Sequence, residues 1–393
     1  MPTLRIGRLI DVNLGKDVYS MSDLRPVRYL IGRCAILVVV GCASASAVAV
    51  PMAPGGPDIG AYAPMPNDAP PGASPRALAA AKALGRGVNF GNMLEAPTEG
   101  AWGVSVPDDF IDKAASAGFT SVRLPVRWSN HAGAEAPFTI DPAFTTRVES
   151  IVDKLLAKNL VVVLNMHHYR QLDGDPLDAG EGKVADALVD VRYLMLWEQI
   201  ASRFKDRGDR LVLELYNEPH GRMNGEPWNV LAARALGVVR KSNPERPVVI
   251  GPTHWNSASD LAQLKLPNDS NLIVTIHDYN PFAFTHQGAE WVNPVLPLGV
   301  TCCSAAQVAE MTGPLDVAKS WAAAKRYPVY VGEFGAYSKA DEASRITFDR
   351  TMRDAMELRG MTWAYWEFAA GFGVYDPATL AFRQGLLDSL LGR

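Results

Sequence analysis

The sequence predicts an α/β fold, a single (β/α)8 barrel of the TIM type over residues 74–393. Eight short apolar segments recur along the chain and alternate with segments of helical periodicity. Most of the apolar segments are continuous, as expected of parallel strands covered on both faces. A doubly wound open sheet is the alternative, but the glycine-rich dinucleotide turn is missing after the first apolar segment. No boundary within these residues indicates a second domain.

Each expected strand is an apolar segment of eight or nine residues that is rich in β-favouring side chains. In chain order the expected strands are Arg86–Met93, Ser121–Trp128, Val161–Tyr169, Leu211–Glu218, Pro247–His254, Asn271–Tyr279, Pro328–Gly335 and Met361–Phe368.

The segments between the strands carry helix start and stop signals. Ser74 is an expected N-cap with Pro75 behind it, and Asp141 followed by Pro142 is a second. Apolar residues after Asp141 fall on one helical face, as do those of Ala187–Phe204. Glycines are expected to end helices at Gly118 and Gly208.

Charge and cysteine content exclude several function classes. The chain has 38 basic and 42 acidic residues and no long basic run, which argues against nucleic-acid or anionic-membrane partners. Four cysteines are too few and too badly placed for a disulfide framework. Cys302 and Cys303 are neighbours, which bridge rarely, so we expect free thiols there, or partners for other groups.

The N-terminal residues 1–50 are expected to be a leader that contains a secretory signal. Three arginines precede the apolar run Ala35–Val50, which ends in small residues and is too short to span a membrane comfortably. Cleavage after these small residues is favoured, and a lipid anchor at Cys42 is the alternative. Translation could begin at Met21. The protein is therefore expected to be secreted or periplasmic, and the Pro/Gly-rich residues 51–73 to be a linker.

Two glutamates end separate expected strands. Glu218 closes the fourth strand beside Asn217, and Glu333 lies near the end of the seventh. The carboxyl ends of barrel strands meet at one rim, so the two carboxyl groups should converge there. Two carboxylates at one site are what acid–base and nucleophilic work on a glycosidic bond requires. Either glutamate alone could be an ordinary loop carboxylate.

Histidines gather at the same expected rim. Of the seven, only His131 lies well away from a strand end. Clustered histidines and carboxylates also suit a metal site. Adjacent His167 and His168 should project to opposite sides of a strand, however, so they cannot easily bind one ion together. We expect no metal and no other cofactor.

Seven motifs occur in order on successive strand ends. They are GVNFGNMLE (87–95), VRLPVRW (122–128), LNMHHY (164–169), LYNEPHG (215–221), HDYNPFAFTHQGAEW (277–291), VGEFGA (331–336) and AYWEFAAGFGVYD (364–376). Over residues 80–390 the chain resembles glycoside hydrolase family 5, the retaining β-glycanases that include endoglucanases and mannanases. The fifth and last motifs resemble a bacterial subgroup of endo-acting glucanases with some mannan activity.

The resemblance implies a role for each matching residue. Glu218 matches the general acid/base and Glu333 the nucleophile, so the first should rest protonated and the second ionised. Arg123 and Tyr279 would hydrogen-bond Glu333, and Asn217 would hold the sugar 2-hydroxyl. The remaining matches are His277 with His167 or His168 as orienting residues, Trp366 as a sugar-stacking platform, and Asn92, Glu95, His286 and Trp291 as peripheral sugar-binding residues.

The implied activity is that of a secreted, retaining endo-β-1,4-glucanase acting on cellulose or a related β-glucan. A β-mannanase or a dual glucanase/mannanase is the alternative, and a non-catalytic polysaccharide-binding barrel is a third possibility. The partner is therefore a β-1,4-linked polysaccharide or oligosaccharide, and the protein is expected to be a monomer. Trp128 and Trp363 are expected in the core, Leu296–Gly313 in a long loop, and His220 on the acceptor side of the groove.

Overall fold

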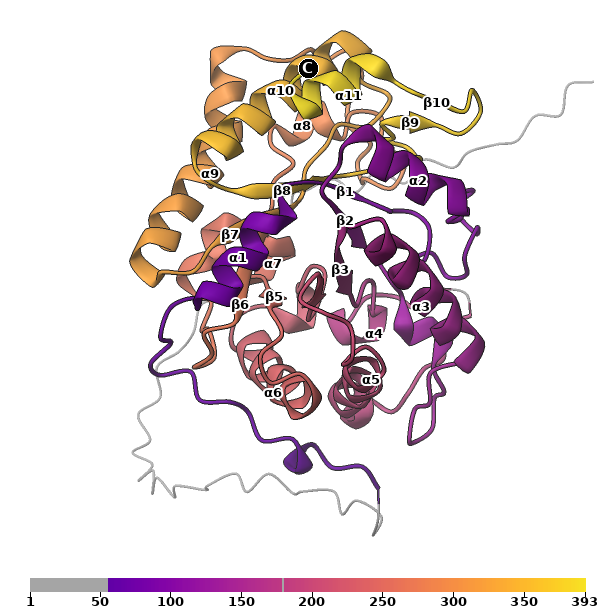
Figure 1. Cartoon of the computed structure of the whole chain (residues 1–393), viewed down its shortest axis with the longest axis vertical. Coiled ribbons are helices and arrows are strands. Elements are labelled where there is room, and N and C mark those ends of the chain that lie inside the picture. The colour runs from indigo at the N-terminus through magenta and orange to yellow at the C-terminus, as the bar shows by residue number, and fades with distance from the viewer. Residues whose placement is uncertain (1–55, 179) are drawn as a thin grey trace, which may run out of the picture. The chain divides into compact units, whose positions relative to one another are not determined.

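The computed structural model describes residues 56–178 and 180–393, and these form one closed parallel barrel (Figure 1). Eight strands pair in chain order and β1 closes onto β8. Their bounds are β1 Arg86–Asn89, β2 Ser121–Leu124, β3 Val161–Asn165, β4 Leu211–Glu214, β5 Val248–Ile250, β6 Leu272–His277, β7 Val329–Glu333 and β8 Thr362–Tyr365. The predicted fold class is confirmed.

Every expected strand is present, but each ends two to four residues earlier than predicted. The chain leaves the sheet where polar residues replace the apolar run, since those side chains line the open rim rather than a packed layer. Asn217 and Glu218 therefore lie in the loop after β4, whereas His277 and Glu333 are the last residues of β6 and β7.

Helices surround the strands, and Figure 1 shows α3, α5, α6 and α9 outside the barrel. The long helices are α2 Asp108–Ala117, α3 Pro142–Ala157, α5 Val189–Arg203, α6 Glu226–Ser242, α9 Ala305–Lys325, α10 Glu342–Leu358 and α11 Gln384–Leu391. The short ones are α4 Arg170–Asp173, α7 Thr253–Asn256 and α8 Phe282–Thr285, and β9 Tyr375–Asp376 pairs with β10 Ala381–Phe382.

Helix α1, Pro75–Leu84, packs against the inward-facing side chains of the barrel. Its residues Ala80, Ala81 and Leu84 are buried in one apolar cluster with strand residues such as Val163 and Tyr330. A separate, larger cluster fills the space between the strands and the outer helices, and it includes Trp128 and Trp363 as predicted. The barrel interior is thus packed at the end that α1 covers, which leaves polar side chains to the opposite end.

Three of the four predicted helix ends are found. The Ser74 hydroxyl accepts from the Ala77 amide, the Asp141 carboxylate accepts from the Ala143 amide, and Gly118 ends α2 in a left-handed conformation. Gly208 does not end a helix: α5 stops at Arg203, and Gly208 lies in the turn before β4.

Two predictions about residues 296–313 are wrong. Ala305–Gly313 is not loop but the first half of α9, which begins with a Ser304–Gln307 capping box. Cys302 and Cys303 are not free thiols, because the structure joins them in a disulfide. The Cys302 amide also donates to the Ser344 hydroxyl on α10, so this loop is held against the barrel's outer layer.

Residues 56–73 form no domain of their own but lie on the outside of the barrel. The Met65 amide donates to the Ala233 carbonyl on α6, and the Ala73 amide donates to the Arg326 carbonyl after α9. The predicted signal and Cys42 lie outside the described residues. Among residues 56–178 and 180–393, no helix is both long enough and apolar enough to cross a bilayer.

Candidate active site

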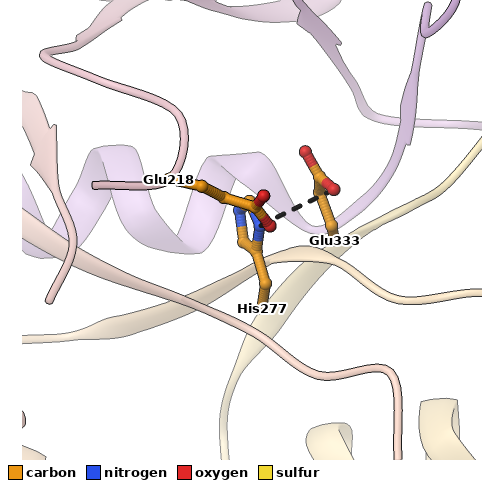
Figure 2. A group of neighbouring side chains, drawn as sticks. All are labelled: Glu218, His277 and Glu333. Atoms are coloured by element: carbon orange, nitrogen blue, oxygen red, sulfur yellow. Dashed lines mark hydrogen bonds and ion pairs between the residues drawn. The ribbon is translucent and has the colours of Figure 1, made fainter. Parts of the chain in front are cut away.

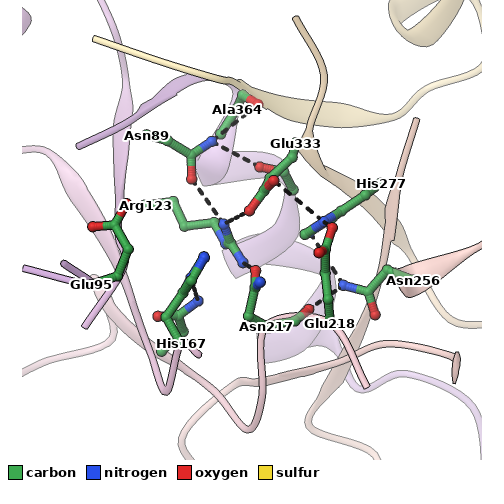
Figure 3. Close-up of polar contacts among 12 residues, drawn as sticks. Asn89, Glu95, Arg123, His167, Asn217, Glu218, Asn256, His277, Glu333 and Ala364 are labelled. Carbon is green, nitrogen blue, oxygen red and sulfur yellow. Dashed lines mark hydrogen bonds and ion pairs between the residues drawn. The ribbon is translucent and has the colours of Figure 1, made fainter. Parts of the chain in front are cut away.

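A buried arginine organises the open end of the barrel (Figure 3). Arg123 on β2 has no exposed side-chain surface, and its guanidinium donates to Glu214 on β4 at 2.7 and 2.8 Å. It also donates to Asn89 on β1 at 2.9 Å, to Asn217 at 2.6 Å and to Glu333 at 2.6 Å. One cation on β2 therefore fixes side chains from the ends of three other strands, β1, β4 and β7.

Glu333 is held by two donors. Arg123 binds its Oε1, and the Tyr279 hydroxyl donates to its Oε2 at 2.9 Å. Both contacts expected from the sequence are present. Burial raises the pKa of Glu333, whereas the charge and hydrogen bond of Arg123 act in the opposite direction. The direct hydrogen bonds favour the ionised form of this carboxyl group.

Glu218 has a different environment, as Figure 2 shows. Its side chain is 21% exposed against 6% for Glu333, and His277 Nδ1 lies 2.6 Å from its Oε1. Burial raises the pKa of Glu218 to about 7, and the charge of Arg123 only partly opposes this. A carboxyl group with this pKa is available as a proton donor near neutral pH.

The protonation state of His277 follows from its second nitrogen. Nε2 lies 3.2 Å from the Asn256 amide nitrogen, and that same nitrogen also donates to the Asn217 carbonyl. Since Asn256 is the donor, Nε2 is an acceptor and the ring proton resides on Nδ1, which faces Glu218. Burial lowers the pKa of His277 to about 4, so the ring is neutral at neutral pH.

One oxygen each of Glu218 and Glu333 and one nitrogen of His277 lie within 4.8 Å of one another. Such a group could hold a metal ion, but its surroundings do not favour one. The Arg123 guanidinium is bonded to Glu333 and would repel a cation, and both Glu333 oxygens already have donors. The arrangement suits proton transfer and attack on a substrate between the carboxyl groups.

Aromatic rings continue the site along one side. His167 stacks on Trp366 with 5.9 Å between ring centroids, and His168 lies edge-on to His167 at 4.4 Å. The two histidine rings are therefore neighbours, and the prediction that they point to opposite sides is wrong. Strict alternation ends with β3 at Asn165, and His168 has a φ of 52°.

The family model described as Cellulase (glycosyl hydrolase family 5) matches residues 83–371. The chain belongs to glycosyl hydrolase family 5. It is 35% identical to "Endoglucanase H" of Acetivibrio thermocellus over 82% of its own length, and 29% identical to "Endoglucanase B" of Clostridium cellulovorans over 75%. It spans 34% of the first of these relatives and 70% of the second.

The chain also matches solved structures over almost their whole length. A hyperthermophilic endo-beta-1,4-glucanase in complex with substrate is 41% identical, with a TM-score of 0.76 over 81% of this chain and 99% of that one. Thermotoga maritima Cel5A in complex with cellobiose is 42% identical, with a TM-score of 0.74 over 81% and 100%. The same enzyme in complex with mannotriose is also 42% identical, with a TM-score of 0.75 over the same shares.

The four peripheral residues expected from the family 5 motifs fall into two groups. Glu95 is fully buried, and its carboxylate accepts from the backbone amides of Asn92 and Met93. Burial raises the pKa of Glu95 to about 8. In this arrangement Glu95 braces the loop after β1, and Asn92, whose φ is 63°, keeps only part of its surface exposed.

The other two peripheral residues lie beyond β6. The His286 ring is 5.0 Å from the Tyr279 ring and 4.2 Å from that of Phe282, and burial lowers the His286 pKa to about 4. Trp291 is 59% exposed, edge-on to Tyr337, and 6.3 Å from the His286 ring. Trp291 is therefore a surface aromatic rather than part of the core.

Sequence reasoning missed three residues that hold this family 5 site. Glu214 is the second carboxylate bonded to Arg123, Asn89 bridges Arg123 to the β7 and β8 backbones, and Asn256 fixes the His277 tautomer. A charged or amide side chain inside an apolar strand was the available signal for Glu214 and Asn89. Asn256 gives no comparable signal, because it lies among other polar residues in the sequence.

Proposed function

We propose that this protein is a retaining endo-β-1,4-glucanase that uses Glu218 as general acid/base and Glu333 as nucleophile. The observation that carries the proposal is the approach of the two carboxyl groups to within 4.8 Å, measured between one oxygen of each. Retaining glycosidases hold their carboxyl groups about 5–5.5 Å apart, whereas inverting enzymes need roughly 6.5–9.5 Å to admit a water.

The chemistry follows from the different donors at each carboxyl group. Glu333, ionised beside Arg123, attacks the anomeric carbon while Glu218 gives its proton to the departing glycosidic oxygen. This forms a covalent glycosyl-enzyme. Glu218, now ionised, then removes a proton from water, which attacks the same carbon and releases Glu333.

The surrounding residues support these steps. Asn217, fixed by Arg123, is suited to hydrogen-bond the sugar 2-hydroxyl, and Trp366 offers a flat face for the sugar bound at Glu333. His277 keeps the Glu218 carboxyl oriented toward the site through its Nδ1 proton.

The export of the protein, through the leader predicted at residues 1–50, belongs to the same proposal. Mass spectrometry of the mature N-terminus tests it.

A dual glucanase/mannanase is the second candidate. Thermotoga maritima Cel5A, at 42% identity, is described in complex with cellobiose in one structure and with mannotriose in another. The 2-hydroxyl is equatorial in glucose and axial in mannose, so a contact from Asn217 would engage the two sugars differently. The two candidates share fold, mechanism and residues and differ only in substrate range.

A digestion panel tests both candidates. The purified protein is incubated with carboxymethylcellulose, glucomannan and galactomannan, and new reducing ends are measured. We expect release from carboxymethylcellulose, with a rapid fall in viscosity because internal bonds are cut. Activity on galactomannan in addition favours the dual enzyme, and activity on mannans alone contradicts the glucanase proposal.

A further inference from the structure

His220 lies two residues after Glu218, and none of the roles above uses it. It occupies the loop between β4 and α6, and its side chain is 16% exposed. Three separate segments meet at its ring: its own loop, the segment at the end of α4, and the β5 connection. A polar ring that is largely enclosed at such a junction usually has a defined hydrogen-bonding task.

Both ring nitrogens of His220 face acceptors. Nδ1 is 2.6 Å from the Glu218 carbonyl oxygen, and Nε2 is 3.2 Å from the Asp175 carboxylate. A neutral imidazole carries one N–H and can donate only once, whereas the imidazolium donates from both nitrogens. A carbonyl and a carboxylate have no proton to give in return, so the geometry fits the imidazolium.

The charged groups around the ring favour the same state. Besides Asp175, a carboxylate oxygen of Asp173 lies 3.7 Å from Nδ1, and Asp173 also accepts from the Tyr216 hydroxyl. Of the groups near the ring on other segments, His168 is neutral because burial lowers its pKa to about 3, and Trp255, which stacks on the ring, carries no charge. Arg170 reaches Asp175 from the far side at 3.1 Å. Burial lowers the pKa of His220, but Asp173, the Glu218 carbonyl and Asp175 together outweigh burial, and the pKa is raised.

The ring also supports an exposed aromatic residue. Trp255 is 54% exposed and stacks on His220 with 4.9 Å between ring centroids and 18° between planes. The Trp255 amide donates to the Pro219 carbonyl, so the backbones of the two loops are joined as well. A change at His220 would therefore reach the Glu218 backbone and the β5 connection together.

We propose that His220 is a positioning residue for the reaction: an imidazolium clamped between the Glu218 carbonyl at Nδ1 and the Asp175 carboxylate at Nε2, which fixes the backbone carrying the acid/base. This rests on the proposed function of Glu218. The His220 charge has a second effect, because it acts against the burial that raises the Glu218 pKa. His220 thus aligns Glu218, and by lowering the Glu218 pKa it also lowers the pH above which Glu218 loses its proton.

The protonation state is tested without activity. The protein has seven histidines, so ¹⁵N-histidine labelling gives few signals, and the one lost in His220→Gln identifies this ring. We expect the ¹⁵N shifts of an imidazolium at pH 6.5 and a pKa above the ordinary histidine value. A neutral single tautomer at that pH contradicts the clamp.

Kinetics test the positioning role. In His220→Gln we expect kcat on a glucan to fall about tenfold with KM nearly unchanged, since a displaced acid loses part of its contribution. An aryl cellobioside with a good leaving group should lose much less in its glycosylation step. The alkaline limb of the pH profile should move up by about half a unit, because removing a cation raises the Glu218 pKa.

His254→Asn is the matched control. His254 pairs with Asp260 in the β5 connection, is half exposed, and has a φ of 51°, which asparagine tolerates. We expect its kcat and alkaline limb to match those of the parent protein. An unchanged limb in His220→Gln overturns the proposal. If the parent protein cleaves no glucan or mannan, the proposed function fails, and the labelling experiment still decides the state of His220.

Discussion

At the scale of single residues, the two carboxyl groups of the site differ in their hydrogen-bond donors. Glu333 receives a guanidinium and a phenol, whereas Glu218 receives one neutral imidazole. The same burial therefore has different consequences: the donors to Glu333 favour its ionised form, whereas burial raises the pKa of Glu218 to about 7. The assignment of acid and nucleophile depends on this asymmetry.

The acid role predicts a dependence on the leaving group. Glu218→Gln should lower kcat/KM on a β-glucan by about 10²- to 10⁴-fold, because an amide cannot protonate the departing sugar oxygen. With a dinitrophenyl cellobioside, the glycosylation step should be nearly unaffected. Steady-state and burst kinetics on the two substrates measure this. Glu226→Gln, an exposed glutamate on α6 that pairs with Lys265, is the control. Equal losses on both substrates would reject the assignment.

The buried position of Arg123 between two carboxyl groups predicts that the protein loses stability when the guanidinium is removed. Arg123→Met leaves Glu214 and Glu333 buried without their cation, so the free energy of unfolding should fall by about 3–5 kcal/mol. Urea unfolding followed by circular dichroism measures it. Arg123→Lys keeps the positive charge but not the forked geometry of the guanidinium. Its free energy of unfolding should therefore lie between those of the parent protein and the methionine variant. A methionine variant as stable as the parent would show that this network is dispensable.

The convergence of Glu218 and Glu333 at one rim could be predicted from the sequence, because each follows an apolar run that was expected to form a barrel strand. The residues that hydrogen-bond to these glutamates, or orient those that do, could be predicted only in part. Arg123 and Tyr279 belong to motifs, but Asn256 reaches His277 from another loop and depends on the three-dimensional path of residues 253–256. The relative orientation of the His167 and His168 side chains could not be predicted either, because the alternation of side chains along β3 ends at Asn165.

At the scale of elements, the order of strands and helices could be predicted and their ends could not. Apolar runs fix which segments enter the barrel, but the last residues of each run are shared between strand and rim loop. The connection after β5 departs most from a regular unit, with the short α7 and a 3₁₀ turn at Ala258–Ala262 in place of a long helix. Loops of this kind follow contacts with neighbours rather than local propensity.

Helix α1 predicts a contrast between its two faces. Leu84 is fully buried with the inward-facing strand residues, so Leu84→Ala should lower the free energy of unfolding by about 2–5 kcal/mol. Leu78 lies on the same helix and is 51% exposed, so Leu78→Ala should change it by less than about 0.5 kcal/mol. Chemical denaturation of both variants measures the contrast. Equal effects would mean that α1 does not close the barrel as described.

At the scale of the whole molecule, buried carboxyl groups predict a stability that falls as the pH rises. Burial raises the pKa of Glu95, Asp349 and Glu367 to about 8 each. These groups bind protons in the folded protein at pH values where they have lost them in the unfolded chain. Their contribution is complete below about pH 4, and it is lost as the pH rises toward 8.

A thermal unfolding series between pH 7 and pH 9, where the histidines with lowered pKa are already neutral, measures this trend, and we expect a lower Tm at the alkaline end. Asp349 has no exposed surface and no hydrogen-bond partner for either carboxyl oxygen within the described residues. Asp349→Asn should therefore be more stable than the parent above pH 8, by about 1 kcal/mol or more. Asp354→Asn, an exposed change on the same helix, is the control. A Tm that is flat or rises with pH contradicts these assignments.

The central claim, that Glu333 attacks sugar across a narrow gap from Glu218, is tested most directly by trapping the intermediate. A 2-deoxy-2-fluoro cellobioside with a good leaving group is added, and the peptides are mapped by mass spectrometry. We expect one added disaccharide per chain, on the peptide that contains Glu333, and none in Glu333→Ala. A label on Glu218, or full turnover with inversion and no label, would contradict the account.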